Sequence, residues 1–364
     1  MPKICFLADA RSPHTLKWVS GCTDLNWEII VISHWPGEVP GARVIVHPLS
    51  LTGFPKYGWR VRRLIRRIKP DIIHAHQFGA HALYAWFSGV APLVITAWGS
   101  DILVKPKQSF FIRCLTKILI RKAALITSDS IQVKDELVAY GAKPEQLMTV
   151  LFGIERQRYL KLAKAAKDPL RVILCSPRLH EPLYNIQVII EAFGQIKKDH
   201  PELELWLLGS GSLTPRLENK AAQTGLGDSI RFWGMVTPQE SMERLAESDL
   251  MISIPSSDAT PVSLLEAMAA GCLPILSDLP AYHDWVAGGV NGLYVKSDFS
   301  DLASVLRRAI VDRGFREMAA AKNREIILER AIWEEQFRPV REFYVAQVKD
   351  RPDIQNTRSG NGEK

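Results

Sequence analysis

The sequence has few cysteines, and no two of them form a metal-binding or redox pair. No Cys-x-x-Cys spacing occurs, and the five cysteines are widely scattered, mostly within apolar runs: Cys5, Cys22, Cys114, Cys175 and Cys272. Isolated cysteines in apolar segments are typical of reduced core residues. This argues against a disulfide framework and against a zinc site, and it favours a reducing compartment.

The chain also lacks a hydrophobic run long enough to span a bilayer. A membrane helix needs about 20 successive, mainly apolar residues, and no such run is present. The first ten residues, MPKICFLADA, have the pattern of a strand with one lysine and an early Asp9, unlike a signal peptide. We therefore expect a cytoplasmic protein.

Motifs that identify several other protein classes are missing. No Gly-x-Gly-x-x-Gly follows the first predicted strand, which argues against an NAD-dependent oxidoreductase. No helix-turn-helix, zinc or RNA-recognition pattern accompanies the basic segments, so nucleic acid is not expected as a partner. No Asp-x-Asp pair is present, and we predict neither a metal site nor a cofactor.

The most informative segment that is present spans residues 251–278, MISIPSSDATPVSLLEAMAAGCLPILSD. Short apolar strands are predicted at 251–254 and 273–276, with a helix over 262–270 between them. The 364-residue chain is long enough for two domains. The segment therefore predicts one βαβ unit within a larger α/β protein.

The start of that helix is a predicted phosphate site. Thr260 is a suitable N-cap, and Pro261 suits the first helical position. The free backbone N–H groups of the first turn, at Val262 and Ser263, should then point into the preceding loop. Such a helix end attracts phosphate.

Two carboxylates flank this helix start. Asp258 lies in the loop and Glu266 about one turn into the helix, so that both can reach one crevice. Glu266 could accept hydrogen bonds from ribose hydroxyls, and Asp258 could face the group on the distal phosphate. A nucleotide fits this arrangement. The alternative is a capped helix with a solvated Glu266 and a turn-forming Asp258.

The same segment resembles the donor-site signature of the retaining glycosyltransferases of family 4. Residues 176–178, 185–193 and 289–295 are similar to further segments of that family. The resemblance implies the GT-B fold, an α/β architecture of two Rossmann-like, doubly wound domains that face each other across a cleft. The matching signature residues are Ser256, Ser257, Asp258, Thr260, Pro261, Leu264, Leu265, Glu266, Ala267, Met268, Ala269, Gly271, Pro274 and Ile275.

Alternating strand and helix patterns agree with two such domains. We predict an amino-terminal, acceptor-side domain at 1–152, followed by a cationic, loop-like linker at 153–169. The donor domain is predicted at 170–330. A final helix at 331–349 should cross back to the first domain, and the polar tail at 350–364 is predicted to be disordered.

The resemblance also implies roles in the donor domain. Arg178, after a predicted strand, would stabilise the donor diphosphate as it leaves. The family usually has a lysine a few residues later, but Tyr184 stands there, so one cation is missing. Gly209 would let the backbone approach the donor closely, and the segment at Trp233 would hold the base.

In the first domain, His76 resembles the family's histidine that reaches the transferred sugar. A buried structural histidine is the alternative, and we predict that role for His74, placed on the opposite side of the strand. Trp98 stands where the family often has a histidine, and it could stack on a sugar ring. Ser12 and His14 lie in a loop without the family's paired glycines and are candidates to contact the acceptor or phosphate.

Positive charge is concentrated in the first half of the chain. Residues 1–170 hold 24 lysines and arginines against 12 acidic residues, whereas residues 171–364 hold 22 against 27. The segments 56–69 and 105–122 contain seven and six basic residues among apolar ones, which predicts basic amphipathic helices. Such helices can lie on an anionic membrane surface, here the inner face of the cell membrane. Alternatively, they only cover the flank of a sheet.

These observations predict a metal-independent, retaining glycosyltransferase of the hexosyltransferase type. It would transfer a sugar from a nucleoside diphosphate, UDP by preference, to a hydroxyl of a cell-envelope lipid or a growing glycan in polysaccharide biosynthesis. Glu266 would hold the ribose and Asp258 would orient the sugar. Arg178 would stabilise the diphosphate, and His76 would position the sugar.

Two alternatives stay open at this point. One is another enzyme on the same fold, such as a sugar-nucleotide epimerase or a phosphorylase. The other is a non-catalytic GT-B protein that binds glycan or lipid. The tyrosine at 184 and the aspartate at 258, where the family has lysine and glutamate, favour the second alternative, whereas the intact helix at 262–270 argues against it.

Overall fold

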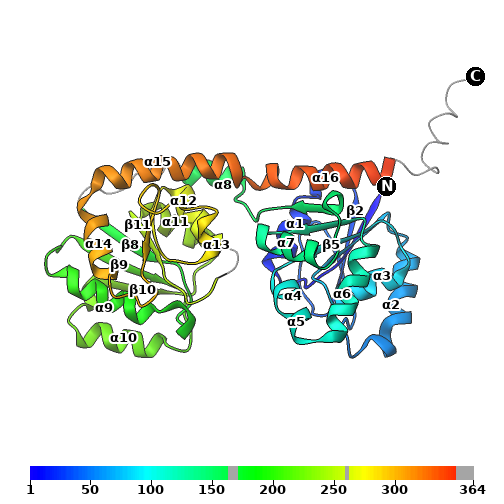
Figure 1. Cartoon of the computed structure of the whole chain (residues 1–364), viewed down its shortest axis with the longest axis horizontal. Helices are drawn as coiled ribbons and strands as arrows, with labels where there is room; N and C mark the ends of the chain where they lie inside the picture. The colour runs from blue at the N-terminus through cyan, green and yellow to red at the C-terminus, as the bar shows by residue number, and fades with distance from the viewer. Residues whose placement is uncertain (163–170, 259–261, 350–364) are drawn as a thin grey trace, which may run out of the picture. The chain divides into compact units, whose positions relative to one another are not determined.

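The computed structural model describes residues 1–162, 171–258 and 262–349 (Figure 1). They fall into two compact units, called unit 1 and unit 2 below. Unit 1 comprises Met1–Leu151 and the segment from Glu334 onward, and unit 2 comprises Phe152–Trp333. The tail predicted at 350–364 and much of the predicted linker lie outside the described residues.

Unit 1 contains a seven-stranded sheet in which all pairings are parallel, in the order β3-β2-β1-β4-β5-β6-β7. Its central strands are mainly apolar because a parallel sheet with both faces covered buries both sides of each strand, and His74 and His76 of β4 are buried as well. The strands are β1 (Lys3–Leu7), β2 (Glu28–Ser33), β3 (Arg43–Val46), β4 (Ile72–His76), β5 (Leu93–Ala97), β6 (Leu125–Ser128) and β7 (Leu147–Thr149).

Helices cover both faces of this sheet. α2, α3 and α6 lie side by side over one face, where Val61, Leu83 and Leu119 join the core (Figure 1). On α1, the ring centroid of Trp18 lies 5.4 Å from that of Phe337 on α16. The helices are α1 (Pro13–Ser20), α2 (Phe54–Ile68), α3 (Ala80–Ser88), α4 (Ser100–Leu103), α5 (Lys105–Gln108), α6 (Phe110–Lys122), α7 (Ile131–Ala139) and α16 (Trp333–Lys349).

Unit 2 contains a six-stranded parallel sheet in the order β10-β9-β8-β11-β12-β13. Its strands are β8 (Val172–Ser176), β9 (Leu203–Leu208), β10 (Ile230–Gly234), β11 (Leu250–Ser253), β12 (Leu273–Ser277) and β13 (Leu293–Val295). Its helices are α8 (Arg156–Leu162), α9 (Ile186–Lys197), α10 (Thr214–Gln223), α11 (Pro238–Glu247), α12 (Val262–Ala270), α13 (Pro280–His283), α14 (Leu302–Val311) and α15 (Arg313–Arg330).

One segment differs from the prediction. The passage after residue 152 was predicted to be loop-like, but α8 lies within it and packs on α11 and α12. This helix has only seven residues, too few for its buried Tyr159 and Leu162 to produce a recognisable period. The basic segment 105–122 contains the short α5 and then α6, which begins where the side chain of Ser109 accepts a hydrogen bond from the Ile112 N–H.

Candidate functional site

Each sheet reverses its strand order at one point. In unit 1 the reversal lies between β1 and β4, and in unit 2 it lies between β8 and β11. Ligands of open α/β sheets bind outside the carboxyl ends of the strands at such points. The residues predicted for the site follow these strands: His76 ends β4, Arg178 follows β8, and Asp258 follows β11.

In unit 2, Arg178 and Asp258 form an ion pair. The Arg178 Nη2 donates to Asp258 Oδ2 at 2.6 Å, and its Nε donates to Ser253 Oγ at 2.7 Å. The two charged side chains are only 11% and 15% exposed. The structure thus brings two predicted site residues together, 80 positions apart in the sequence.

Tyr282 belongs to the same cluster, although the sequence did not single it out. It lies on the short helix after β12, and its hydroxyl donates to Asp258 Oδ2 at 2.8 Å. The Tyr282 hydroxyl oxygen also accepts from Arg178 Nη2 at 3.2 Å, and it lies 3.4 Å from Ser253 Oγ. Burial raises the pKa of Tyr282, so the hydroxyl remains protonated.

Tyr184 contacts the other side of this cluster. The Arg178 guanidinium carbon lies 5.6 Å from the centroid of the Tyr184 ring, a cation–π contact. The next residue, Asn185, donates to the Ile254 carbonyl at 2.8 Å and to Ser256 Oγ at 3.2 Å. At the position where the resemblance implies a second cation, this chain therefore has the aromatic ring of Tyr184, which contacts Arg178.

On α12, the three partly exposed residues are Val262, Ser263 and Glu266, and the others are buried. Positions i, i+1 and i+4 lie on one side of a helix, so Ser263 and Glu266 share the face that the core leaves open. The Ser263 hydroxyl is buried and has no hydrogen-bond partner among the described residues. Thr260, the predicted N-cap, lies outside the described residues.

Gly209 and Trp233 make contacts within the protein. Gly209 has φ +97°, and a Cβ there would lie 3.0 Å from the Arg178 carbonyl oxygen, so the turn after β8 already occupies that space. The Trp233 ring packs against the Arg244 guanidinium at 4.0 Å and against Trp206 at 5.4 Å. Contact of either residue with a donor stays a prediction.

In unit 1, an aromatic cluster surrounds the end of β4. His14 and Trp98 have ring centroids 4.4 Å apart, and Trp98 lies 5.6 Å from His76. Ser12 is the N-cap residue of α1, but its side chain makes no capping bond. Thr15 Oγ1 lies 3.5 Å from Nδ1 of His76. The predicted acceptor-side residues are thus neighbours in unit 1.

His76 is buried, and burial lowers its pKa well below the ordinary value, so the ring is neutral. Its Nε2 has no hydrogen-bond partner among the residues that the structure describes. A buried nitrogen without a partner is costly unless something binds it. This favours a ligand-facing role over that of a fully satisfied core histidine.

The predicted orientation of His74 was wrong. Side chains two positions apart in a strand point to the same side, and the rings of His74 and His76 lie 5.0 Å apart. His74 is structural, as predicted: its Nδ1 lies 2.7 Å from the Tyr344 hydroxyl, and its Nε2 lies 2.7 Å from the Thr96 hydroxyl. These bonds attach α16 to β4 and β5.

Asp101 is a second residue that the sequence did not single out. Its buried carboxylate accepts the Phe78 N–H at 2.8 Å and the Trp98 N–H at 2.9 Å. It thereby joins the turns that follow β4 and β5, and so fixes the backbone beside His76. Burial raises the pKa of Asp101 to about 6, against the effect of the two N–H donors.

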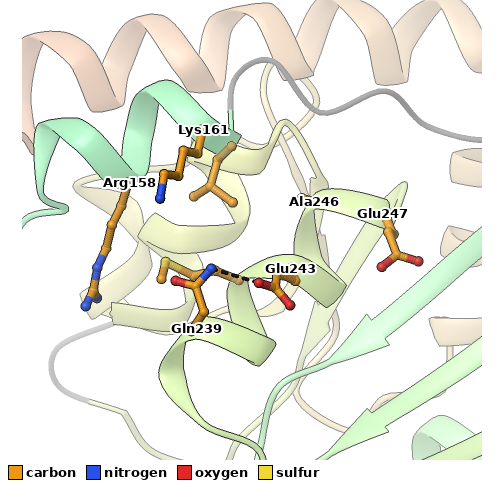
Figure 2. Close-up of a pocket in the computed structure, with 8 residues that line it drawn as sticks. Arg158, Lys161, Gln239, Glu243, Ala246 and Glu247 are labelled. Carbon is orange, nitrogen blue, oxygen red and sulfur yellow. Dashed lines mark hydrogen bonds between the residues drawn. The ribbon is translucent and has the colours of Figure 1, made fainter.

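Two surface cavities lie elsewhere. Figure 2 shows one of about 340 Å³ between α8 and α11, where Arg158 and Lys161 face Gln239 and Glu243. The amide of Gln239 donates to Glu243 at 2.8 Å. Another, of about 480 Å³, lies beside α16. None of the predicted site residues in the described part of the chain lines either cavity.

No helix among the described residues is sufficiently long and apolar to cross a membrane. Within the same residues, no group of three or more histidine, cysteine, aspartate or glutamate side chains is arranged to hold a metal ion.

Comparison with known proteins shows which family this chain is similar to. The model for "Glycosyl transferase 4-like" proteins matches residues 3–130, and that for "Glycosyl transferases group 1" matches residues 160–326. An amylovoran biosynthesis glycosyltransferase of Erwinia amylovora is 32% identical over 182 residues, which are 48% of this chain and 44% of that protein. A sulfoquinovosyl transferase of Arabidopsis thaliana is 25% identical over 338 residues, 83% of this chain and 64% of that protein. The chain thus spans less than two thirds of the length of these two relatives.

A solved structure agrees with the fold. Anabaena HepE, crystallised with UDP and glucose, superposes with a TM-score of 0.74 at 18% identity, over 95% of this chain and 100% of that one. The predicted fold class and family are confirmed. With matches that extend over both units, the chain belongs to the group 1 glycosyl transferases and has the GT-B fold.

Proposed function

We propose that this chain transfers a sugar from a nucleoside diphosphate sugar to a hydroxyl group of a cell-envelope lipid or glycan. The observation that carries the proposal is the cluster at the switch point of unit 2, where Arg178 and Asp258 meet just before α12. Family membership supports the same reaction class. The amylovoran relative supports a role in polysaccharide biosynthesis.

In the proposed reaction, the bond between the anomeric carbon and the phosphate oxygen breaks while the acceptor oxygen bonds to the same face of the sugar. The acceptor proton passes to the departing diphosphate. Arg178 and the backbone N–H groups at the start of α12 offset the charge on that diphosphate without a metal ion. Glu266 accepts hydrogen bonds from the ribose, Asp258 orients the sugar, and the neutral His76 holds the transferred sugar through Nε2.

UDP is the proposed nucleotide and a hexose the proposed sugar. Anabaena HepE has been crystallised with UDP-glucose, which supports this choice by similarity of fold. A thermal-shift screen of the purified protein against UDP-, GDP- and ADP-sugars, with and without magnesium, tests it. We expect stabilisation by one base, independent of magnesium; no stabilisation by any of them would favour a non-catalytic binding protein.

Replacing Glu266 by alanine should weaken donor binding by about 1–3 kcal/mol, or about 5- to 150-fold, because a charged acceptor of ribose hydrogen bonds is lost. The measurement is a calorimetric titration with the donor that gives the largest thermal shift. Glu218→Ala, at an exposed position of α10, is the matched control and should bind the donor as wild type does. Unchanged affinity in Glu266→Ala would remove the ribose role.

We further propose that unit 1 lies on an anionic membrane surface through 56–69 and 105–122. The inner faces of α2 and α6 cover the sheet, as the alternative interpretation requires. Their outer faces, however, also carry large aromatic side chains among the cations: Trp59, Phe110 and Phe111 are 70%, 79% and 65% exposed. Exposed aromatic residues beside lysine and arginine are typical of membrane-surface helices.

Replacing Arg60, Arg63 and Arg67 by glutamine should therefore weaken binding to anionic vesicles by about 1 kcal/mol for each charge removed. Co-sedimentation with vesicles of anionic or of neutral lipid measures this. A control triple variant at exposed cations of unit 2 (Lys198, Arg216, Lys322) should bind like wild type. Equal binding of wild type to both kinds of vesicle would contradict the membrane proposal.

A further inference from the structure

The cation that is proposed to receive the donor diphosphate already has an anion bound to it. Arg178 Nη2 lies 2.6 Å from Asp258 Oδ2, and both side chains are largely shielded from water. Such a charge-assisted bond is stronger than a neutral one. A diphosphate that uses the guanidinium in the same way must displace this carboxylate.

The surrounding residues favour the paired state. Tyr282 donates to Asp258 and accepts from Arg178, so its hydroxyl bridges the two partners only while they are together. Ser253 accepts from Nε of the same guanidinium and fixes its orientation. Tyr184 places an aromatic ring, and no additional charge, against the same guanidinium.

We propose that Asp258 competes with the donor diphosphate for Arg178, so that nucleotide binding and release of the Asp258 carboxylate toward the sugar are one step. The inference rests on the proposed function and extends it to substrate selection. A nucleotide that carries a sugar gives the displaced carboxylate new hydroxyl partners. A free nucleoside diphosphate does not, and its binding is opposed by the return of Asp258 to Arg178.

This competition has a consequence for turnover. After transfer, the product at the site is the free diphosphate, and the sugar hydroxyls have left with the acceptor. Asp258 then loses its sugar partners and recovers Arg178, supported by Tyr282. The Arg178–Asp258 ion pair therefore weakens binding of the product more than binding of the substrate. Neither ligand takes part in this ion pair, because it is open while either of them is bound.

The test is a calorimetric titration with the free nucleoside diphosphate, taken as whichever of UDP, GDP and ADP stabilises the protein most. Asp258→Asn keeps the shape but removes the charge, and it should bind the diphosphate at least tenfold more tightly than wild type. Tyr282→Phe keeps the carboxylate but removes its bridge, and it should show a smaller gain of a few-fold. Asp228→Asn, on an exposed turn of unit 2, should be unchanged.

Other outcomes separate this inference from the proposed function. Equal or weaker diphosphate binding by Asp258→Asn, together with loss of binding in Glu266→Ala, would overturn the competition and leave the donor site in place. Absence of binding to wild type and to Asp258→Asn would overturn both proposals. If Asp258→Asn fails to fold, Tyr282→Phe decides the question, and no gain in that variant overturns the competition.

Discussion

Replacing Arg178 by alanine is expected to lower the rate of sugar transfer by about 10²- to 10³-fold, the usual effect of removing one group that stabilises developing negative charge. The variant should also lose about 3 kcal/mol of unfolding free energy, because Asp258 is left as a shielded charge without its cation. Release of the nucleoside diphosphate from the donor measures the rate. Urea unfolding measures the stability.

A double variant separates these two effects. Arg178→Ala combined with Asp258→Asn removes both charges, so most of the lost stability should return while the rate stays low. Arg178→Lys keeps the charge but lacks the separate Nε and Nη2 donors that contact Ser253 and Asp258, and it should fall between wild type and alanine. An alanine variant as stable and as active as wild type would contradict the role of the pair.

Replacing Asp101 by alanine is expected to destabilise unit 1 by about 2–6 kcal/mol. Its carboxylate is the acceptor for the N–H groups of Phe78 and Trp98, and each buried donor left without a partner costs about 1–3 kcal/mol. The turns after β4 and β5 should loosen together, so the transfer rate should also fall through misplacement of His76 and Trp98. Hydrogen exchange of the two amides would report this loosening directly.

The pH dependence of the same residue supplies an independent check. The pKa of Asp101 is raised in the folded protein, from 3.8 to about 6. The contribution of the protonated carboxyl to the free energy of unfolding is therefore complete below the unfolded pKa, and it is lost as pH rises through the folded pKa. Between pH 3 and 7, wild type should lose about 3 kcal/mol relative to Asp101→Asn, which cannot ionise. A stability difference that does not change with pH would show that the carboxyl titrates normally.

The parts of the candidate site that the sequence pattern itself suggests lie next to each other along the chain. Asp258, Ser263 and Glu266 were recognised because a strand, a loop and a helix start leave a local pattern. The same holds for His76 at the end of a buried strand. Arg178 was named through family resemblance, and the structure adds the contact with Asp258 that the pairing of β8 with β11 makes possible.

Tyr282 and Asp101 could not be predicted in this way. Each acts across neighbouring loops: Tyr282 is 24 positions from Asp258, and Asp101 is 23 positions from Phe78. Only the register of adjacent parallel strands brings such loops together, and neither residue stands in a pattern of its own. The error on His74 had another cause. Side chains two positions apart in a strand point to the same side, so His74 should have been predicted beside His76.

Nucleotide binding at the switch point of unit 2 is tested most directly by a crystal structure with UDP. We expect the ribose hydroxyls within about 3 Å of the Glu266 carboxylate, the diphosphate on Arg178 and on the first turn of α12, and Asp258 moved away from Arg178. Nucleotide bound elsewhere, for example in the cavity between α8 and α11, or an Arg178–Asp258 pair that stays closed with UDP bound, would contradict this expectation.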